Sequence, residues 1–248
     1  MAKYDSLNEA LANKKDATTL ELYENTVYLA LEDTLYTPSG LSPDIGQLTN
    51  LTTLELSDNH ELSSLPAEIG QLTKLMTLRL NGISTLKSLP VEIGQLTNLA
   101  ELDLYGNNLT GLPSEIGQLV NLTELGLGFN KLSNLPVEIG RLTNLTTLYI
   151  GGEINNRNVL ENLPGEIGLL TNLTSLRLER NKLSNLPAEI GQLTNLTELD
   201  LYGNKLKSLP SEIGQLSKLK TLNLKDNRFS NEAEEQIKQL LPNCEIDF

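Results

Sequence analysis

The sequence predicts an α/β solenoid. It has a parallel concave sheet of about nine short strands, short helical turns on the convex side and a helical cap at each end. Three observations indicate this fold: a 23-residue pattern recurs along most of the chain, leucine dominates the composition, and aromatic residues make up only 4%. A globular core normally mixes several apolar residue types, so this bias indicates one core position copied many times.

Two consecutive segments show the pattern clearly. Leu173–Asn195 reads LTSLRLERNKLSNLPAEIGQLTN, and Leu196–Lys218 reads LTELDLYGNKLKSLPSEIGQLSK. Both fit the template LxxLxLxxNxLxxLPxEIGxLxx. A degenerate first copy begins near Ala17, which gives about nine copies over residues 17–229 within a single domain of residues 1–248. The complete copies start at Leu51, Leu75, Leu99, Leu122, Leu145, Leu173, Leu196 and Leu219.

Each copy contains the parts of one solenoid turn. Alternate residues of a strand point to opposite faces, so Leu102 and Leu104 are expected inside, and Asp103 and Tyr105 outside. The Pro of LPxEIG is expected at the first position of a helical turn, its Glu at the positive end, and its Gly at the end of the turn. The Asn at template position nine is expected to turn inward and satisfy buried backbone groups: Asn59, Asn107, Asn130, Asn181, Asn204 and Asn227.

Both ends of the stack carry capping signals. Residues 1–16 contain an S-x-x-E spacing at Ser6 before an apolar helical face, and residues 230–248 contain an N-x-x-E spacing at Asn231. These spacings predict a helix at each end, followed at the C-terminal end by a short last strand. Such caps shield the apolar core that a stack of repeats exposes at its ends.

The template resembles that of leucine-rich-repeat proteins. The likeness is closest to the 23-residue class with LPxEIGxL in its second half, which bacterial members and intracellular Ras-group members share. It covers Ala17 to Phe248, and its repetition makes it far more specific than a single short motif. The resemblance implies a horseshoe-shaped solenoid that binds its partner on the concave face.

Some copies depart from the template. Extra residues fall after the strand and before the LP segment, within Thr26–Gly40 in the first copy and within Gly151–Asn162 in the copy from Leu145. They therefore emerge on one edge, where they form a candidate binding edge, although loops also tolerate insertions without any function. Two copies also lose the template Asn, to Ile83 and to Glu153. The predicted partner-binding residues of the edge loop are Glu153, Asn155, Asn156 and Arg157.

The centre of the concave face is the main candidate binding surface. Gly126 and Gly128 are expected to leave a dip there, with Tyr105, Phe129 and Tyr149 around it. Exposed aromatic and arginine side chains are the usual energetic anchors of interfaces. The alternative is that the tyrosines simply pair across the sheet. The predicted partner-binding residues of this face are Arg79, Asp103, Tyr105, Phe129, Tyr149, Arg177, Glu179, Arg180 and Tyr202.

Several function classes are disfavoured. The formal net charge of −13 opposes binding to nucleic acid or to anionic membranes. His60 is the one histidine and Cys244 the one cysteine, so no catalytic or metal-binding constellation and no cofactor are expected. The chain has no apolar run long enough for a signal peptide or a membrane span, so a cytoplasmic protein is expected. Export without a classical signal, or loss of a signal, remains open.

The predicted function is a non-catalytic protein–protein interaction module, acting as a monomer. It would bind a protein or peptide on its concave face and on its insertion-bearing edge. Two alternatives from other classes remain: a self-assembling scaffold or adhesion protein, and a receptor for carbohydrate or another small ligand that uses the aromatic dip. Self-association would indicate the first, and glycan binding the second.

Overall fold

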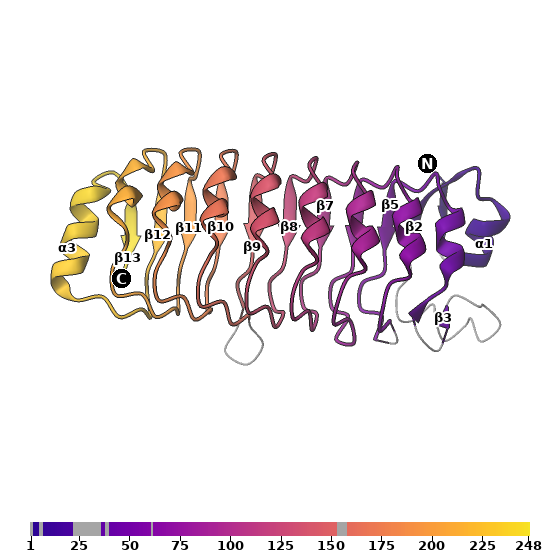
Figure 1. Ribbon diagram of the computed structural model, residues 1–248, viewed down its shortest axis with the longest axis horizontal. Helices are drawn as coiled ribbons and strands as arrows, with labels where there is room; N and C mark the ends of the chain where they lie inside the picture. The colour runs from indigo at the N-terminus through magenta and orange to yellow at the C-terminus, as the bar shows by residue number, and fades with distance from the viewer. Residues whose placement is uncertain (1, 5–6, 22–35, 38–39, 61, 153–157) are drawn as a thin grey trace.

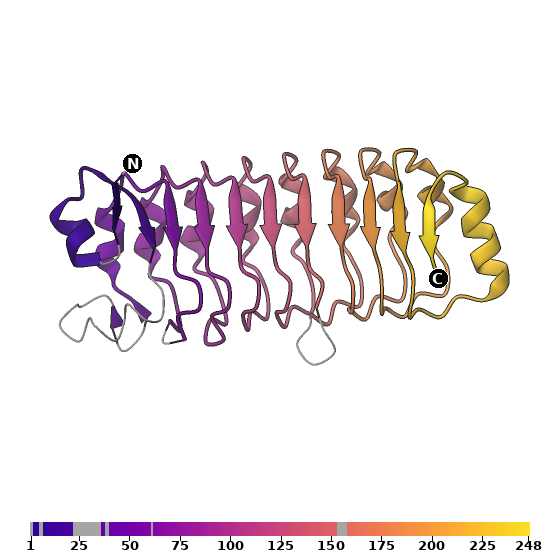
Figure 2. The same cartoon turned by 180° about the vertical axis from the view of Figure 1, so that it is seen from behind.

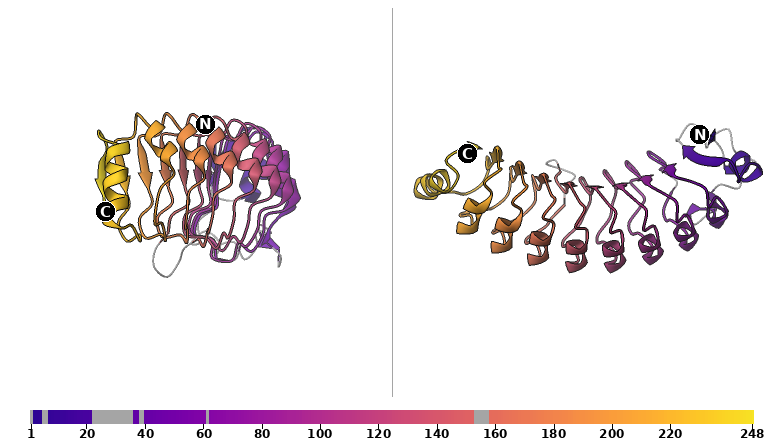
Figure 3. Two further views of the ribbon diagram at one scale, coloured as in Figure 1. Left: turned by 60° about the vertical axis from the view of Figure 1, so that its left-hand side comes forward. Right: turned by 90° about the horizontal axis from the view of Figure 1, so that it is seen from above.

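The computed structural model describes residues 2–4, 7–21, 36–37, 40–60, 62–152 and 158–248. They form an elongated, curved solenoid with the chain termini toward opposite ends (Figure 1). The view from above shows the strands on the inner side of the curve and the short helices on its outer side (Figure 3). The predicted arrangement of a concave sheet and convex helical turns is therefore confirmed.

The described residues form one sheet of eleven strands, all paired in parallel. Nine of these strands come from the repeat copies, as predicted, and β13 is the expected last strand. The first strand, β1, was not expected. The strands in order are β1 Ala2–Tyr4, β2 Ala17–Glu21, β5 Thr53–Glu55, β6 Thr77–Arg79, β7 Glu101–Asp103, β8 Glu124–Gly126, β9 Thr147–Tyr149, β10 Ser175–Arg177, β11 Glu198–Asp200, β12 Thr221–Asn223 and β13 Glu245–Asp247.

The template leucines set the register of the sheet. Leu102 lies opposite Leu125, and Leu125 lies opposite Leu148. All three side chains are buried, whereas the residues before and after each of them face the concave side that Figure 2 presents. Because the side-chain period of a strand is two, a slip of one residue would expose this whole row of leucines.

The convex helices are 3₁₀ helices of five residues. Their bounds are η1 Pro43–Gln47, η2 Ala67–Gln71, η3 Val91–Gln95, η4 Ser114–Gln118, η5 Val137–Arg141, η6 Gly165–Leu169, η7 Ala188–Gln192 and η8 Ser211–Gln215. The position expected for Pro was wrong by one residue from η2 onward. Pro66 is the N-cap of η2, with φ −73° and ψ 157°. In the first copy Ser42 takes the place of the template Pro and is likewise the N-cap, of η1. The extended N-cap conformation suits proline because its ring already fixes φ near this value.

The role expected for the glycine of EIG was also wrong. Gly70 lies inside η2 and does not end it. A Cβ on Gly70 would lie 2.8 Å from the carbonyl oxygen of Glu92 in the next copy. The glycine therefore permits close stacking of successive convex helices, and a larger residue would push the copies apart.

The inward-pointing asparagines form the predicted ladder. The Asn130 amide nitrogen donates to the carbonyls of Leu104 (2.8 Å) and Leu127 (3.1 Å), and its oxygen accepts from the backbone N–H of Leu109 (2.9 Å). One side chain thus connects two copies and satisfies a buried backbone donor.

The ladder corrects one expectation and confirms another. The copy from Leu145 does not lose its asparagine, because Asn158, five residues after Glu153, is fully buried and donates to the carbonyls of Leu127 and Ile150. Asn158 therefore occupies the ladder position although the insertion precedes it in the sequence. At Ile83 the ladder is interrupted as predicted.

Helices cover both ends of the stack, α1 at Leu7–Ala12 and α3 at Asn231–Leu240. The N-cap of α3 is Ser230, one residue before the predicted Asn231, and its side chain accepts from the N–H of Ala233 (3.3 Å). A serine hydroxyl serves as well as an asparagine amide at this position. Two further short strands, β3 Tyr36–Thr37 and β4 Gly40–Leu41, pair antiparallel beside the first copies.

Candidate functional site

Three aromatic rings meet at the centre of the concave face. The ring centroids of Tyr105 and Phe129 are 4.5 Å apart, and those of Tyr105 and Tyr149 are 5.9 Å apart in a stacked arrangement. The residues come from three successive copies, at template positions five, seven and eight. Tyr105 is 37% exposed, so the cluster presents apolar surface to solvent. The structure therefore brings together the three aromatic residues that the sequence predicted to surround the centre.

The sequence predicted a dip over Gly126 and Gly128, but the structure has a hollow over Gly126 only. The ring of Tyr149 lies over Gly128: a Cβ on that glycine would be 2.6 Å from Cε1 and 2.9 Å from Cζ of the ring. The Glu179 carboxylate covers Gly151 in the same way, one copy further on. Because Gly128 and Gly151 have no side chain, a side chain of the next copy can lie directly against their backbone. Neither of these glycines leaves an open space.

Gly126 does leave an open hollow. Its volume is about 150 Å³, and it is lined by Glu101, Leu102, Asp103, Glu124, Leu125, Gly126, Thr147 and Tyr149. The Asp103 carboxylate leans into this space, since a Cβ on Gly126 would be 2.8 Å from its Oδ1. Asp103 also accepts a hydrogen bond from the N–H of Tyr105 (3.0 Å). Two carboxylates of the hollow, Glu101 and Glu124, were missed from the sequence, although template position three faces the concave side by the same alternation as position five.

Tyr149 and Glu179 form a coupled pair. Burial raises the pKa of the Tyr149 hydroxyl, and the neighbouring Glu179 carboxylate, which accepts its hydrogen bond, raises it further. Burial also raises the pKa of Glu179, together with the charge of Asp200. The Oε2 atom of Glu179 is buried and has no hydrogen-bond partner among the described residues. An unpartnered buried carboxylate oxygen destabilises the folded state when it is charged.

The predicted arginines are already engaged within the protein. Arg79 makes two hydrogen bonds to the Glu101 carboxylate, at 2.8 and 3.0 Å. Arg177 pairs with Glu198 at 2.8 Å. Arg180 stacks on Tyr202, with Cζ 4.7 Å from the ring centroid, and donates to its hydroxyl at 3.0 Å. By strand order these arginines lie on either side of the aromatic cluster. Arg79 and Arg177 are each paired with a carboxylate.

The backbone is strained at two of these residues. Phe129 and Arg180 both have φ near +58°, a left-handed conformation that bulky residues rarely adopt. Both occupy template position eight, where three other copies have glycine with positive φ: Gly82, Gly106 and Gly203. Non-glycine residues held in this conformation cluster at functional sites. Asp58 and Asp226 occupy the same position with the same conformation, so the positive φ belongs to the repeat. Phe129 and Arg180 differ from the other copies in holding a bulky side chain there.

The predicted edge-loop residues Glu153, Asn155, Asn156 and Arg157 lie outside the described residues. A hollow of about 310 Å³ is lined by Ser133, Asn134, Val159, Glu161, Asn162 and Lys182.

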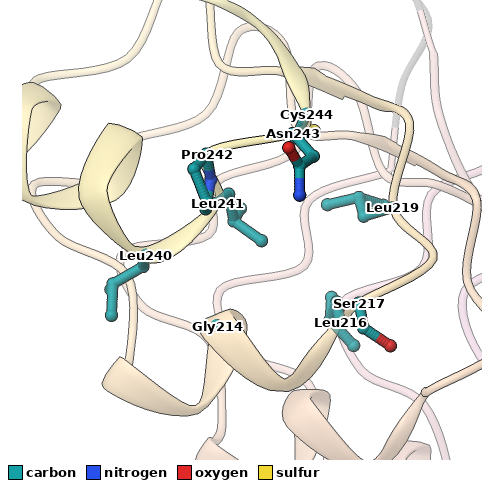
Figure 4. Close-up of a pocket in the computed structure, with 9 residues that line it drawn as sticks. All are labelled: Gly214, Leu216, Ser217, Leu219, Leu240, Leu241, Pro242, Asn243 and Cys244. Carbon is teal, nitrogen blue, oxygen red and sulfur yellow. The ribbon is translucent and has the colours of Figure 1, made fainter.

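A further hollow lies between η8 and the C-terminal cap (Figure 4). It measures about 180 Å³ and is bordered by Leu240 of α3 and by Cys244. Cys244 is partly buried against the core, and burial raises the pKa of its thiol to about 11. A thiol with a raised pKa is protonated at neutral pH and is a poor nucleophile.

Neither metal ligation nor a membrane span emerges from the described part of the chain. Among these residues, no group of three His, Cys, Asp or Glu side chains could hold a metal ion. No described helix has the length and apolar character needed to cross a membrane.

Comparison with known proteins identifies the family. The description "leucine-rich repeat region" matches residues 25–110 and 164–241, and "leucine rich repeat" matches residues 97–156. The chain therefore belongs to the leucine-rich-repeat family, which confirms the resemblance drawn from the template. No curated protein matches the sequence.

Solved structures include similar repeat proteins. A TDR receptor is 30% identical, with a TM-score of 0.73, over 96% of this chain and 40% of its own. A plant peptide hormone receptor, RGFR1 in complex with RGF2, is 27% identical, with a TM-score of 0.70, over 99% of this chain and 42% of its own. A leucine-rich-repeat protein of Leptospira interrogans is 29% identical over the full length of both chains, with a TM-score of 0.37. This chain thus spans about two fifths of the two receptor chains.

Proposed function

We propose that the protein is a non-catalytic module that binds a protein or peptide partner on the centre of its concave face. The observation that carries this proposal is the exposed cluster of Tyr105, Phe129 and Tyr149, one member of which is held in a strained backbone conformation. Core packing does not require these rings, because leucine and isoleucine side chains fill the interior. A rigid, preformed surface also loses little conformational entropy on binding.

The similar structures support the same type of partner. RGFR1 was solved in complex with RGF2, and another receptor, GASSHO1/SCHENGEN3 from Arabidopsis thaliana, with CASPARIAN STRIP INTEGRITY FACTOR 2. The second is 31% identical, with a TM-score of 0.58, over 77% of this chain and 26% of its own. By analogy we propose an extended peptide or protein segment as the partner, bound by one copy of this chain. The edge loop would contribute secondary contacts.

A binding comparison tests the proposal. Immobilised wild-type protein and the Phe129→Ala/Tyr149→Ala variant are used to capture partners, which are identified by mass spectrometry and then measured by calorimetry. The variant should bind at least about tenfold more weakly, because buried aromatic anchors dominate interfaces. The control is Val91→Ala/Val137→Ala, which removes apolar side chains that are 54% and 52% exposed on the convex face. Equal binding by all three proteins would refute the concave assignment.

A further inference from the structure

The charge of the concave face points to the chemistry of its partner. The acidic residues at its outward-facing positions outnumber the basic ones. The acidic residues are Glu55, Asp58, Glu101, Asp103, Glu124, Glu179, Glu198, Asp200, Asp226, Glu245 and Asp247, and the basic residues are Arg79, Arg177, Arg180 and Lys225. Each of these basic side chains already contacts another side chain of the protein. Arg79, Arg177 and Lys225 pair with carboxylates, and Arg180 stacks on Tyr202. A partner therefore meets a surface of excess negative charge.

Part of this negative charge lies around the hollow over Gly126. The residues that line this space include Glu101, Asp103 and Glu124, and the Asp103 carboxylate lies over Gly126. Arg79 binds Glu101, but neither Asp103 nor Glu124 forms an ion pair with any residue that the structure describes. Burial and the charges of Glu101 and Glu55 raise the pKa of Asp103. A cation placed in the hollow would relieve this repulsion between carboxylates.

The size and lining of the hollow suit a single side chain of the partner. Its volume of about 150 Å³ is well below the roughly 300 Å³ at which small-molecule pockets begin. It is open to the concave side, and the ring of Tyr149 forms part of its wall. Cations are attracted to the faces of tyrosine rings. An acidic hollow with an aromatic wall thus suits the end of a lysine or arginine side chain.

We infer that the partner is a basic, extended peptide segment that inserts one lysine or arginine side chain into the hollow over Gly126, between Asp103 and Glu124 and beside Tyr149. This inference deepens the proposed function and rests on it. The apolar part of the segment packs on Tyr105 and Phe129, which lie beside the hollow through their ring contacts with each other and with Tyr149.

The test begins with random linear peptides displayed on phage and selected on the immobilised full chain. The most enriched peptide is synthesised with its basic residues intact, and again with each one replaced by a neutral isostere: citrulline for arginine, norleucine for lysine. Affinities are measured by fluorescence anisotropy at two salt concentrations. The inference expects lysine or arginine at one enriched position and a loss of roughly tenfold or more on neutralisation, because paired charges at interfaces couple strongly.

Matched protein variants locate the contact. Asp103→Asn/Glu124→Gln removes two charges from the hollow, and Glu138→Gln/Glu189→Gln removes two from the convex face. Gly126→Val fills the hollow and pushes against the Asp103 carboxylate, which lies 2.8 Å from a Cβ at this position. Gly111→Val adds the same atoms where a Cβ meets nothing within 4 Å. Asp103→Asn/Glu124→Gln and Gly126→Val should weaken binding of the basic peptide, whereas Glu138→Gln/Glu189→Gln and Gly111→Val should not. The neutral peptide should be insensitive to Asp103→Asn/Glu124→Gln, since its partner charge is already gone.

The outcomes separate the inference from the proposed function. Selected peptides without a basic position, or with equal affinity for Asp103→Asn/Glu124→Gln and wild type, would overturn the inference. The proposed function would still stand if the same peptides lost binding to Phe129→Ala/Tyr149→Ala. If the peptides bind Phe129→Ala/Tyr149→Ala as tightly as wild type, or if no peptide is enriched, both the inference and the concave assignment fail.

Discussion

The phenol ring of Tyr149 rests on the α-carbon of Gly128 from the preceding copy, and a Cβ at Gly128 would lie 2.6 Å from the ring. The backbone carbonyl of Gly151 would be only 3.1 Å from the same Cβ. The glycine is thus part of the site, because it fixes the height of the ring above the sheet. The position of Tyr149 in turn sets one wall of the hollow over Gly126.

Gly128→Ala should therefore move the Tyr149 ring and disturb the binding surface. Overpacking of this kind typically costs about 1–3 kcal/mol, so the urea midpoint should fall and binding of the selected peptide should weaken. Gly111→Ala, with an open space around its Cβ, is the matched control and should change neither. An unchanged midpoint and affinity for Gly128→Ala would show that the ring moves aside at no cost.

The strained backbone of Phe129 predicts an unusual order of stability. In a strand or helix, alanine is more favourable than glycine by about 0.5–1 kcal/mol. At φ +58° the order should reverse, so Phe129→Gly should be more stable than Phe129→Ala by roughly 1 kcal/mol. Both should lose peptide affinity, because both lack the ring. Urea unfolding of the two variants measures the difference, and a more stable alanine variant would argue against strain at this position.

Much of the fold follows from the sequence because each element depends on local periodicity. The strand centres coincide with template leucines such as Leu102, and Asn130 turns inward as the position-nine rule predicts. Even the strain at Phe129 has a sequence signal, since the equivalent residue is glycine in four other copies, three of them with positive φ. These features repeat, so each copy provides independent support for the others.

The details of the site depend instead on contacts between copies. Gly126 and Gly128 look equivalent in the sequence, yet Tyr149 covers one and leaves the other open. Which of the two glycines is covered depends on the rotamer of Tyr149, 21 positions after Gly128, and no local sequence pattern encodes that rotamer. Asn158 was missed for a related reason, because an insertion moves the residue along the chain without moving it in space.

The asparagine ladder predicts a large effect from a small chemical change. Asn130→Asp keeps the acceptor for the Leu109 N–H, but it replaces the amide donor with a charged oxygen facing the carbonyls of Leu104 and Leu127. A buried carboxylate with one oxygen facing two carbonyls should cost more than about 3 kcal/mol at neutral pH. Asn227→Asp makes the same change at a partly exposed position near the C-terminal end and should cost much less. Equal costs would mean that burial does not determine the role of this side chain.

The buried carboxylate of Glu179 predicts that stability depends on pH. Its pKa is raised in the folded protein, first by burial and then by the charge of Asp200, so the folded state binds a proton more readily than the unfolded state. Stability therefore falls as pH rises from the ordinary glutamate value, 4.5, through the raised pKa.

Glu179→Gln removes this ionisation and should unfold at a higher urea concentration than wild type at pH 7, with the advantage shrinking as the pH is lowered through that window. Because glutamine retains an oxygen that accepts from Tyr149, the ring should stay in place and peptide affinity should change little. Asp103, whose pKa is also raised by burial, contributes in the same direction, so the test compares Glu179→Gln with wild type at each pH. A constant difference between the two proteins across the window would show that Glu179 has the same pKa in the folded and unfolded states.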